Sequence, residues 1–472
     1  MKNNKELVLK TLKLLSIILL YYIVGSKNLF LYVLSLSLYN IFISCFNHIS
    51  IKDNLKKMST NNSKTKLLKL LLSVISVISF IFLLSSILIS DLLTTFLNLN
   101  NITTIFIFEG LCIITKPLIK ILSEYLENIK TNSNYKKLLN LYDILDNILL
   151  IIIALFTFRI FKLKENIAIS LLYLSKILST FIILLIIYYL NKPLKINKDN
   201  REDKINYSKE IKKILTNNIY KSIIEIVKNS YYYLSIIILY LVLSTRYNYN
   251  VNELGKIITF IYLYSLSIIE YLIYLAKLIT KTLPNENLAK LYQTFKMILT
   301  ITIIFGIISP LTCKLVFNDP SKSIYLIMVN ILSIFILLYD ITYENIKNKT
   351  VIYISLAVGL ILKIVLIIPL INSFYRMGYN LVYGDITSTI IAMFISTIIN
   401  YIYLKNKEKN KINYFDKILD IVYDNILLCI ILILVEFIVP IDTSSYIKSL
   451  GLIIIYITIS ITYIKIKNKK RG

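Results

Sequence analysis

The densest set of charged side chains inside an apolar stretch is Lys221, Glu225 and Lys228, within residues 217–243. Their spacing of four and then three residues places all three on one helical face. Tyr231 and Tyr232 follow. Ammonium groups neutralise phosphate, and tyrosines pack on sugar rings while donating hydrogen bonds, so this face suits a sugar diphosphate. The competing interpretation is a local ion-pair ladder, solvated near the end of a helix.

Three further charged residues, Lys176, Glu270 and Lys363, also lie within apolar stretches. Ionisable groups inside a bilayer cost so much free energy that they normally face a bundle interior, water or an opposite charge. Each deep lysine can therefore line a cavity or pair with a nearby acid, and the sequence leaves both open. The predicted substrate-binding set is Lys176, Lys221, Glu225, Lys228, Tyr231, Tyr232, Glu270 and Lys363.

Two carboxylates, Asp143 and Asp146, are three residues apart and share a helical face. Such a pair can bind Na⁺ or hold a proton, and it would then couple transport to an ion gradient. The alternative is a surface ion pair with Lys136 and Lys137, which precede the same stretch. We predict no bound cofactor; the energy source would be an H⁺ or Na⁺ gradient or the membrane potential.

The elements that must position these side chains are apolar stretches long enough to cross a bilayer. Hydrophobic residues make up 57% of the chain and the mean hydropathy is +0.70, which excludes a water-soluble fold. About fourteen stretches approach the roughly 20 residues that a membrane helix needs. They are 7–26, 29–46, 67–90, 102–122, 138–158, 166–190, 217–243, 254–279, 294–317, 323–342, 350–371, 385–404, 415–439 and 446–464. The sequence predicts an all-α integral membrane protein.

The net charge of +26 is distributed unevenly between the two sides of the predicted membrane. If the N-terminus is cytoplasmic, the inner connectors carry most of the lysines and arginines, and the outer ones carry few. This bias predicts a multi-pass protein of the cytoplasmic membrane with both termini inside. Anionic lipids of the inner leaflet are then the expected partners of the basic face, and a nucleic-acid partner is not needed to explain the charge.

The sequence contains no pattern typical of an enzyme or a metal site. Cys45, Cys112, Cys313 and Cys429 each stand alone, so neither zinc spacing nor a disulfide framework is present. His48 is the only histidine, and we interpret it as a loop residue. Neither a P-loop nor a Gly-rich nucleotide-binding motif occurs. We therefore predict that the protein is not an enzyme and holds no metal.

Polar connectors divide the stretches into groups of six, six and two. The predicted organisation is a six-helix bundle over 1–190, a cytoplasmic linker over 191–213, a second six-helix bundle over 214–404, and a two-helix unit with a basic tail over 405–472. Paired bundles of equal helix number are a common transporter plan, with the substrate path at their interface.

Three segments resemble a known family. Residues 345–403 resemble its eleventh and twelfth helices, 42–72 its second-to-third-helix connector, and 241–290 its seventh and eighth helices. The family is the multidrug/oligosaccharidyl-lipid/polysaccharide (MOP) flippase superfamily, in particular the polysaccharide-transporter, stage V sporulation protein B and MurJ-like branch. The chain departs from the pattern at Glu109-Gly110, where relatives carry Arg-Gly.

The resemblance implies alternating-access transport of a polyprenyl-diphosphate-linked oligosaccharide or polysaccharide precursor, with glycosyltransferases of the same pathway as partners. One alternative is a cation-coupled multidrug exporter of the same fold. Another is a membrane glycosyl polymerase or transferase, or a relative that no longer transports. A diphosphate needs a positively charged lining whereas cationic drugs need acids. The lysines of the predicted set therefore favour the anionic cargo.

Overall fold

The computed structural model describes residues 2–26, 28–97, 102–130, 137–191, 206–217, 219–268, 270, 271, 274, 287–346, 348–407, 423, 425–434 and 446–469. All regular secondary structure in these ranges is helical. The predicted apolar stretches are helical over most of their described residues, with breaks at Ile113 and Ile114 and at Tyr173. The prediction of an all-α protein is therefore confirmed.

The helices fall into two compact units, Met1–Phe260 and Ile261–Gly472, called here the N-terminal and C-terminal units. The predicted linker 191–213 lies mostly outside the described residues, so the predicted domain boundaries stay a prediction. The units divide inside a short π-helical segment, η3 (Phe260–Ser265).

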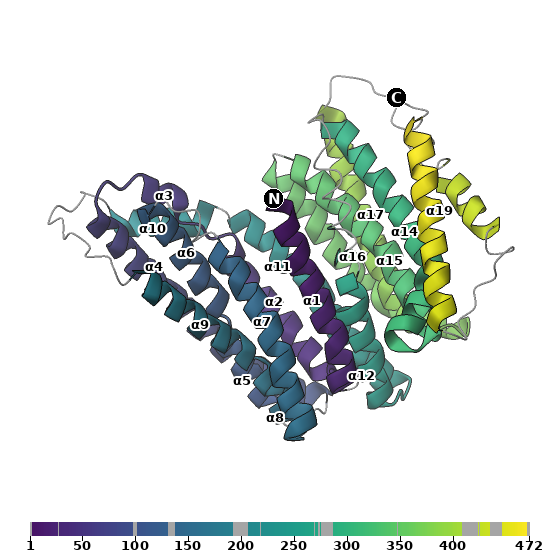
Figure 1. The fold of residues 1–472 in the computed structure, drawn as a ribbon, viewed down its shortest axis with the longest axis horizontal. Coiled ribbons are helices and arrows are strands. Elements are labelled where there is room, and N and C mark those ends of the chain that lie inside the picture. Colours follow the sequence, from purple (N-terminus) through teal and green to yellow (C-terminus); the bar gives the residue numbers. More distant parts are fainter. Residues whose placement is uncertain are drawn as a thin grey trace. The chain divides into compact units, whose positions relative to one another are not determined.

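The N-terminal unit is built around α2, which packs against α11, α5 and α12, while α7 packs against α9 and α1 (Figure 1). Its elements are α1 (Lys2–Val24), α2 (Phe30–Asn47), α3 (Lys52–Lys56), α4 (Asn61–Leu97), α5 (Thr103–Cys112), α6 (Thr115–Lys130), α7 (Leu138–Ala154), η2 (Leu155–Ile160), α8 (Glu165–Leu172), α9 (Leu174–Asn191), α10 (Tyr207–Asn217), α11 (Ile219–Arg246) and α12 (Val251–Thr259).

The C-terminal unit centres on an antiparallel pair, α16 and α17, with α15 packed on α17 and α14 packed on both α15 and α19. Its elements are α14 (Asn287–Phe317), η4 (Pro320–Lys322), α15 (Ser323–Asn345), α16 (Lys349–Arg376), α17 (Val382–Lys407), a shorter apolar helix (Asn425–Leu434) and α19 (Tyr446–Lys469). Leu428, Leu432, Leu452 and Tyr456 pack with Ile308 and Leu311, so the last two helices are anchored on α14.

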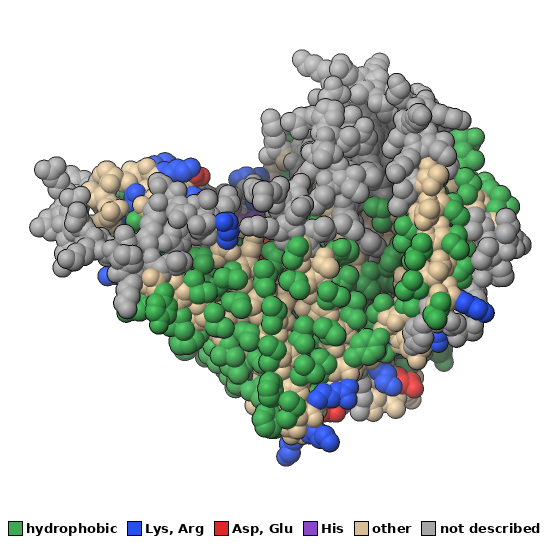
Figure 2. Space-filling model, viewed as in Figure 1, with side chains coloured by type: hydrophobic (Ala, Val, Ile, Leu, Met, Phe, Trp, Pro, Cys, Tyr) green, Lys and Arg blue, Asp and Glu red, His purple; other side chains and the backbone are tan. Residues whose placement is uncertain are grey.

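Apolar side chains cover much of the outer surface of the helices. Among the described residues, nine helices are long and apolar enough to cross a membrane. On α4, Leu70, Val77, Ile81, Leu84 and Leu88 expose between 39% and 64% of their surface and share one face. Figure 2 shows apolar side chains along the helices and Lys and Arg side chains near the helix ends. Such a surface is stable only against lipid, so the chain is a multi-pass membrane protein.

The α16–α17 pair depends on a glycine at its closest approach. A Cβ atom at Gly384 would lie 2.5 Å from the backbone nitrogen of Ile371 and 2.6 Å from its Cα. Backbone atoms cannot yield as a flexible side chain would, so α16 and α17 must separate to accept even a methyl group.

Gly384→Ala is therefore expected to lower the free energy of unfolding by about 1–3 kcal/mol, the usual cost of overpacking. Gly306→Ala in α14 is the matched control, because no described atom beyond its own turn of helix lies within 4 Å of its added Cβ. The control should be neutral or stabilising, since alanine favours helix over glycine by about 1 kcal/mol. Unfolding by SDS titration in micelles measures both. Equal stability of the two variants would contradict the close approach.

Candidate functional site

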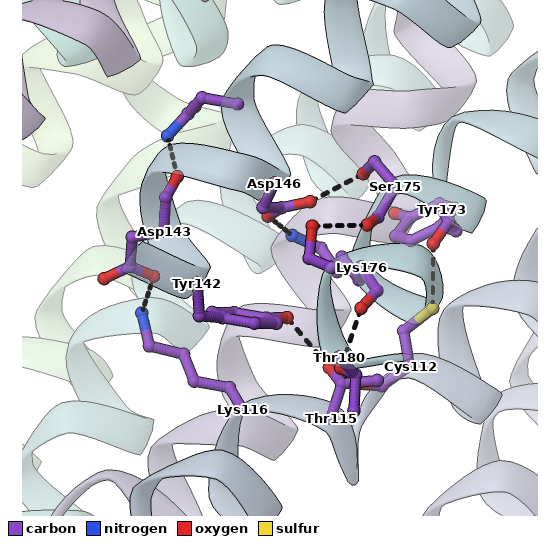
Figure 3. A network of polar contacts seen from close by, with 12 residues as sticks. Cys112, Thr115, Lys116, Tyr142, Asp143, Asp146, Tyr173, Ser175, Lys176 and Thr180 are labelled. Carbon is purple, nitrogen blue, oxygen red and sulfur yellow. Dashed lines mark hydrogen bonds and ion pairs between the residues drawn. The ribbon is translucent and has the colours of Figure 1, made fainter. Parts of the chain in front are cut away.

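Among the described residues of the N-terminal unit, the most buried ion pair is centred on Lys176, where α9 packs along α7 (Figure 3). The Lys176 ammonium donates to Asp146 Oδ2 at 2.7 Å, and Ser175 Oγ donates to Asp146 Oδ1 at 2.6 Å. The lysine and aspartate side chains are only 14% and 17% exposed. Both carboxylate oxygens are thus bound, and the two charges neutralise each other in a region of low dielectric constant.

Tyrosine rings surround this ion pair. The Lys176 ammonium lies 5.2 Å from the ring centre of Tyr39, within cation–π range. Tyr142 shares a hydrogen bond of 3.0 Å with a threonine hydroxyl of α6, and Tyr173 shares one of 2.8 Å with a serine hydroxyl of α2. The Lys176 cluster is defined as Asp146, Ser175, Lys176, Tyr32, Tyr39, Tyr142 and Tyr173. It combines one cation with aromatic surfaces and hydroxyl groups, the combination that a sugar phosphate requires.

The second predicted coupling acid, Asp143, has its own lysine. Lys116 donates to Asp143 Oδ1 at 2.9 Å, and the two side chains are 38% and 31% exposed. Asp143 and Asp146 therefore bind two different lysines from two different helices, α6 and α9. Lys136, a partner considered from the sequence, lies outside the described residues. Within the described ranges, no three His, Cys, Asp or Glu side chains are grouped as metal ligands would be.

The predicted face of α11 contacts the end of α2. Asn47 Nδ2 donates to Glu225 Oε1 at 2.7 Å, and His48 Nε2 lies 3.0 Å from Glu225 Oε2. His48 directly follows α2, and it contributes a contact with Glu225 that its interpretation as a loop residue did not suggest. Lys221 and Lys228 are half-buried on the same helix.

The two tyrosines that follow on α11 differ in exposure. Tyr231 is fully buried and Tyr232 is half-buried. Glu225 is thus the residue of this face that contacts the C-terminal end of α2. The buried Tyr231 ring lies farther along α11.

In the C-terminal unit, Lys363 of α16 is paired with Asp385 of α17. The ammonium donates to Asp385 Oδ1 at 3.0 Å and to the hydroxyl of Thr389, while Tyr262 donates its hydroxyl hydrogen to Asp385 Oδ2. Both charged side chains are 1% exposed. Three elements, α16, α17 and η3, therefore meet at one buried ion pair whose polar atoms are hydrogen-bonded.

The predicted set is divided between the units. Six members, from Lys176 to Tyr232, belong to the N-terminal unit, while Glu270 and Lys363 belong to the C-terminal unit, where Glu270 is exposed. Their role in substrate binding stays a prediction. Sequence reasoning missed Asp385 as the partner of Lys363. The available signal was that 350–371 and 385–404 are consecutive antiparallel stretches, whose residues near the turn must face each other.

Comparison with solved structures identifies the fold. A structure described as "Lipid II flippase MurJ, inward closed conformation" matches with a TM-score of 0.68 and 13% identity, covering 99% of this chain and 98% of that one. An inward-facing multidrug resistance MATE family transporter of the MOP superfamily matches with a TM-score of 0.55 and 11% identity, covering 84% of this chain and 94% of that one.

A MATE structure in complex with MaD5 matches with a TM-score of 0.50 and 11% identity, covering 86% of this chain and 94% of that one. No protein-family model matches the sequence, and no curated protein matches it. The likeness therefore lies in the arrangement of helices, as the resemblance of the three segments predicted. The chain has the fold of the MOP flippase superfamily.

Proposed function

We propose that this protein is a flippase that moves a polyprenyl-diphosphate-linked oligosaccharide or polysaccharide precursor across the cytoplasmic membrane by alternating access. The observation that carries the proposal is the extent of the structural match. The fold described as a lipid II flippase covers 99% of this chain, whereas the MATE fold with a TM-score of 0.55 covers 84%. Of these two folds, that of the lipid II flippase accounts for nearly the whole chain.

The charges of the N-terminal unit support an anionic cargo. Lys176 lies among tyrosines and, within the described residues, pairs with one acid, Asp146. Either cargo requires this pair to open. A diphosphate would then neutralise the Lys176 ammonium while Ser175 still donates to Asp146, whereas a cationic drug would bind Asp146 and leave the lysine charge buried without a counter-charge. Multidrug export remains the second candidate, because MATE transporters share the fold.

The proposal is tested with purified protein in vesicles that contain a fluorescent polyprenyl-diphosphate-linked sugar. A membrane-impermeant quencher should reach the label several-fold faster in vesicles with the protein than in vesicles without it. A fluorescent lipophilic cation is the control cargo. It should cross the membrane at the same rate in vesicles with and without the protein. Transport of the cation with no flipping of the lipid would replace the proposal with multidrug export.

The proposed orientation, with both termini cytoplasmic, makes a separate prediction. Tyr379 is exposed in the turn between α16 and α17, and Asn200 and Asn410 lie outside the described residues. In a background without the native cysteines, Tyr379→Cys should react with an impermeant thiol reagent in intact cells, because the outer turns carry few cations. Asn200→Cys and Asn410→Cys should react only after permeabilisation. Reaction of Asn200→Cys in intact cells would overturn the topology.

A further inference from the structure

Glu109 is a buried acid of the N-terminal unit that the proposed function does not use. It lies on α5 with no exposed surface, and none of the ion pairs among the described residues includes it. Its neighbour Gly110 packs against α4 so closely that a Cβ would lie 2.6 Å from Leu83 Cδ1. The acid is therefore held in a tight apolar contact between two membrane helices.

The contacts of the Ser86 hydroxyl favour a protonated Glu109, because an ionised carboxylate would leave two acceptors and one hydrogen. Ser86 Oγ on α4 lies 2.9 Å from Glu109 Oε2 and 3.0 Å from the carbonyl oxygen of Phe82. A serine hydroxyl has one hydrogen and cannot donate fully to two acceptors. If Glu109 carries a proton on Oε2, it donates to Ser86 Oγ while Ser86 donates to Phe82, and both contacts are satisfied.

The burial of the other carboxyl oxygen, Oε1, also favours the protonated form of Glu109. Glu109 Oε1 is buried and has no hydrogen-bond partner among the described residues. An ionised carboxylate with one donor and no cation costs many kcal/mol in an apolar interior, whereas the neutral acid costs far less. On α11, which packs on α4, Tyr233 lies within electrostatic range of Glu109, and its buried hydroxyl also lacks a partner in the described part of the chain.

Among the described residues, the titratable groups that interact electrostatically with Glu109 are Cys112, Tyr173 and Tyr233, and none of them is a cation. Lys176 and Asp146, which also interact with Cys112, are bound to each other at 2.7 Å.

We propose that Glu109 is a proton-binding site of the N-terminal unit: its carboxylate takes one proton from water when the α4–α5–α11 contact is open and holds it as a neutral carboxylic acid when the contact is closed. The Tyr233 hydroxyl is the nearby group that can donate to Oε1 when the helices shift. The site differs from the predicted coupling acids Asp143 and Asp146, which are neutralised by lysines.

Infrared spectroscopy of the purified full chain in nanodiscs tests the proposal without any cargo. At neutral pH, far above the ordinary glutamate pKa of about 4.3, a carbonyl band of a protonated carboxyl group is expected. It should vanish in Glu109→Gln, shift in Ser86→Ala, and persist in Glu124→Gln. Glu124 is the matched control, because it is also buried, with 8% of its surface exposed, but accepts from Ser50 Oγ at 2.9 Å and from the backbone N–H of Ile51 at 2.8 Å. No such band in the wild type, or a band that survives Glu109→Gln in folded protein, would overturn the proposal.

A second measurement asks whether the proton is coupled to transport, and this arm rests on the proposed flippase function. Glu109→Gln is fixed in the neutral form, so an imposed pH gradient should no longer change the flipping rate, while flipping without a gradient continues. A gradient effect that is unchanged in Glu109→Gln would overturn the coupling role. If the wild type flips no lipid at all, the proposed function fails, while the infrared result stands independently.

Discussion

Asp385→Leu is expected to lower the free energy of unfolding by about 3–5 kcal/mol, because it leaves the fully buried Lys363 ammonium without its carboxylate. Leucine fills a similar volume, so the loss comes from the uncompensated charge rather than from a cavity. The double variant Lys363→Met/Asp385→Leu should recover most of the stability, since well-packed apolar side chains often replace a buried ion pair at little cost.

The control is Lys322→Met, which removes the lysine of a partly exposed pair in the same unit. Lys322 Nζ lies 3.6 Å from Asp319 Oδ2, and the two side chains are 21% and 39% exposed. Exposed pairs contribute about 0–1 kcal/mol, so this variant should unfold close to the wild type. SDS titration in micelles measures all the variants. A double variant as unstable as Asp385→Leu alone would show that the ion pair is required as such, and the desolvation argument would be wrong.

Lys176→Gln is expected to reduce flipping of a diphosphate-linked sugar roughly 10- to 100-fold. A charge-assisted hydrogen bond contributes about 1.5–3 kcal/mol, and each 1.4 kcal/mol corresponds to about tenfold in a rate or binding constant. Asp146→Asn should have the opposite effect on binding, because it removes the carboxylate that competes with the phosphate for the Lys176 ammonium. A lower substrate concentration for half-maximal flipping is the expected readout for Asp146→Asn.

Lys116→Gln is the matched control for this cluster. Lys116 also pairs with an aspartate of α7, but it is 38% exposed and water screens its charge. Flipping should change little. Equal losses in Lys176→Gln and Lys116→Gln would indicate a general effect of charge on the basic face, and full activity of folded Lys176→Gln would place the diphosphate site elsewhere.

The helices themselves follow from the sequence. Each apolar stretch is long enough for a membrane helix, and in lipid the backbone must satisfy its hydrogen bonds within the segment, so composition alone decides helix over other structures. The sequence also indicated that Lys176 and Lys363 needed an unusual environment, because an isolated ammonium is too costly inside a bilayer. Both residues are ion-paired in the structure.

The sequence did not show where an apolar stretch is broken into two helices. The stretch 102–122 reads as a single apolar segment, yet it is two helices, α5 ending at Cys112 and α6 beginning at Thr115. Pro117 lies in the first turn of α6, where its missing N–H would be unpaired in any case. The break brings Thr115 and Lys116 to α7, where they contact Tyr142 and Asp143.

The partners of the buried charges were decided by tertiary structure alone. Helical spacing fixes which residues share a face, but it does not specify which distant helix that face will meet. Glu225 thus contacts Asn47 and His48 at the end of α2, more than 170 positions earlier in the chain. Glu109 likewise became a candidate proton site only when packing placed it against Ser86 and left its Oε1 without a hydrogen-bond partner among the described residues. The sequence identifies which side chains can carry a charge. Their burial and their counter-ions depend on how the helices pack in the folded protein.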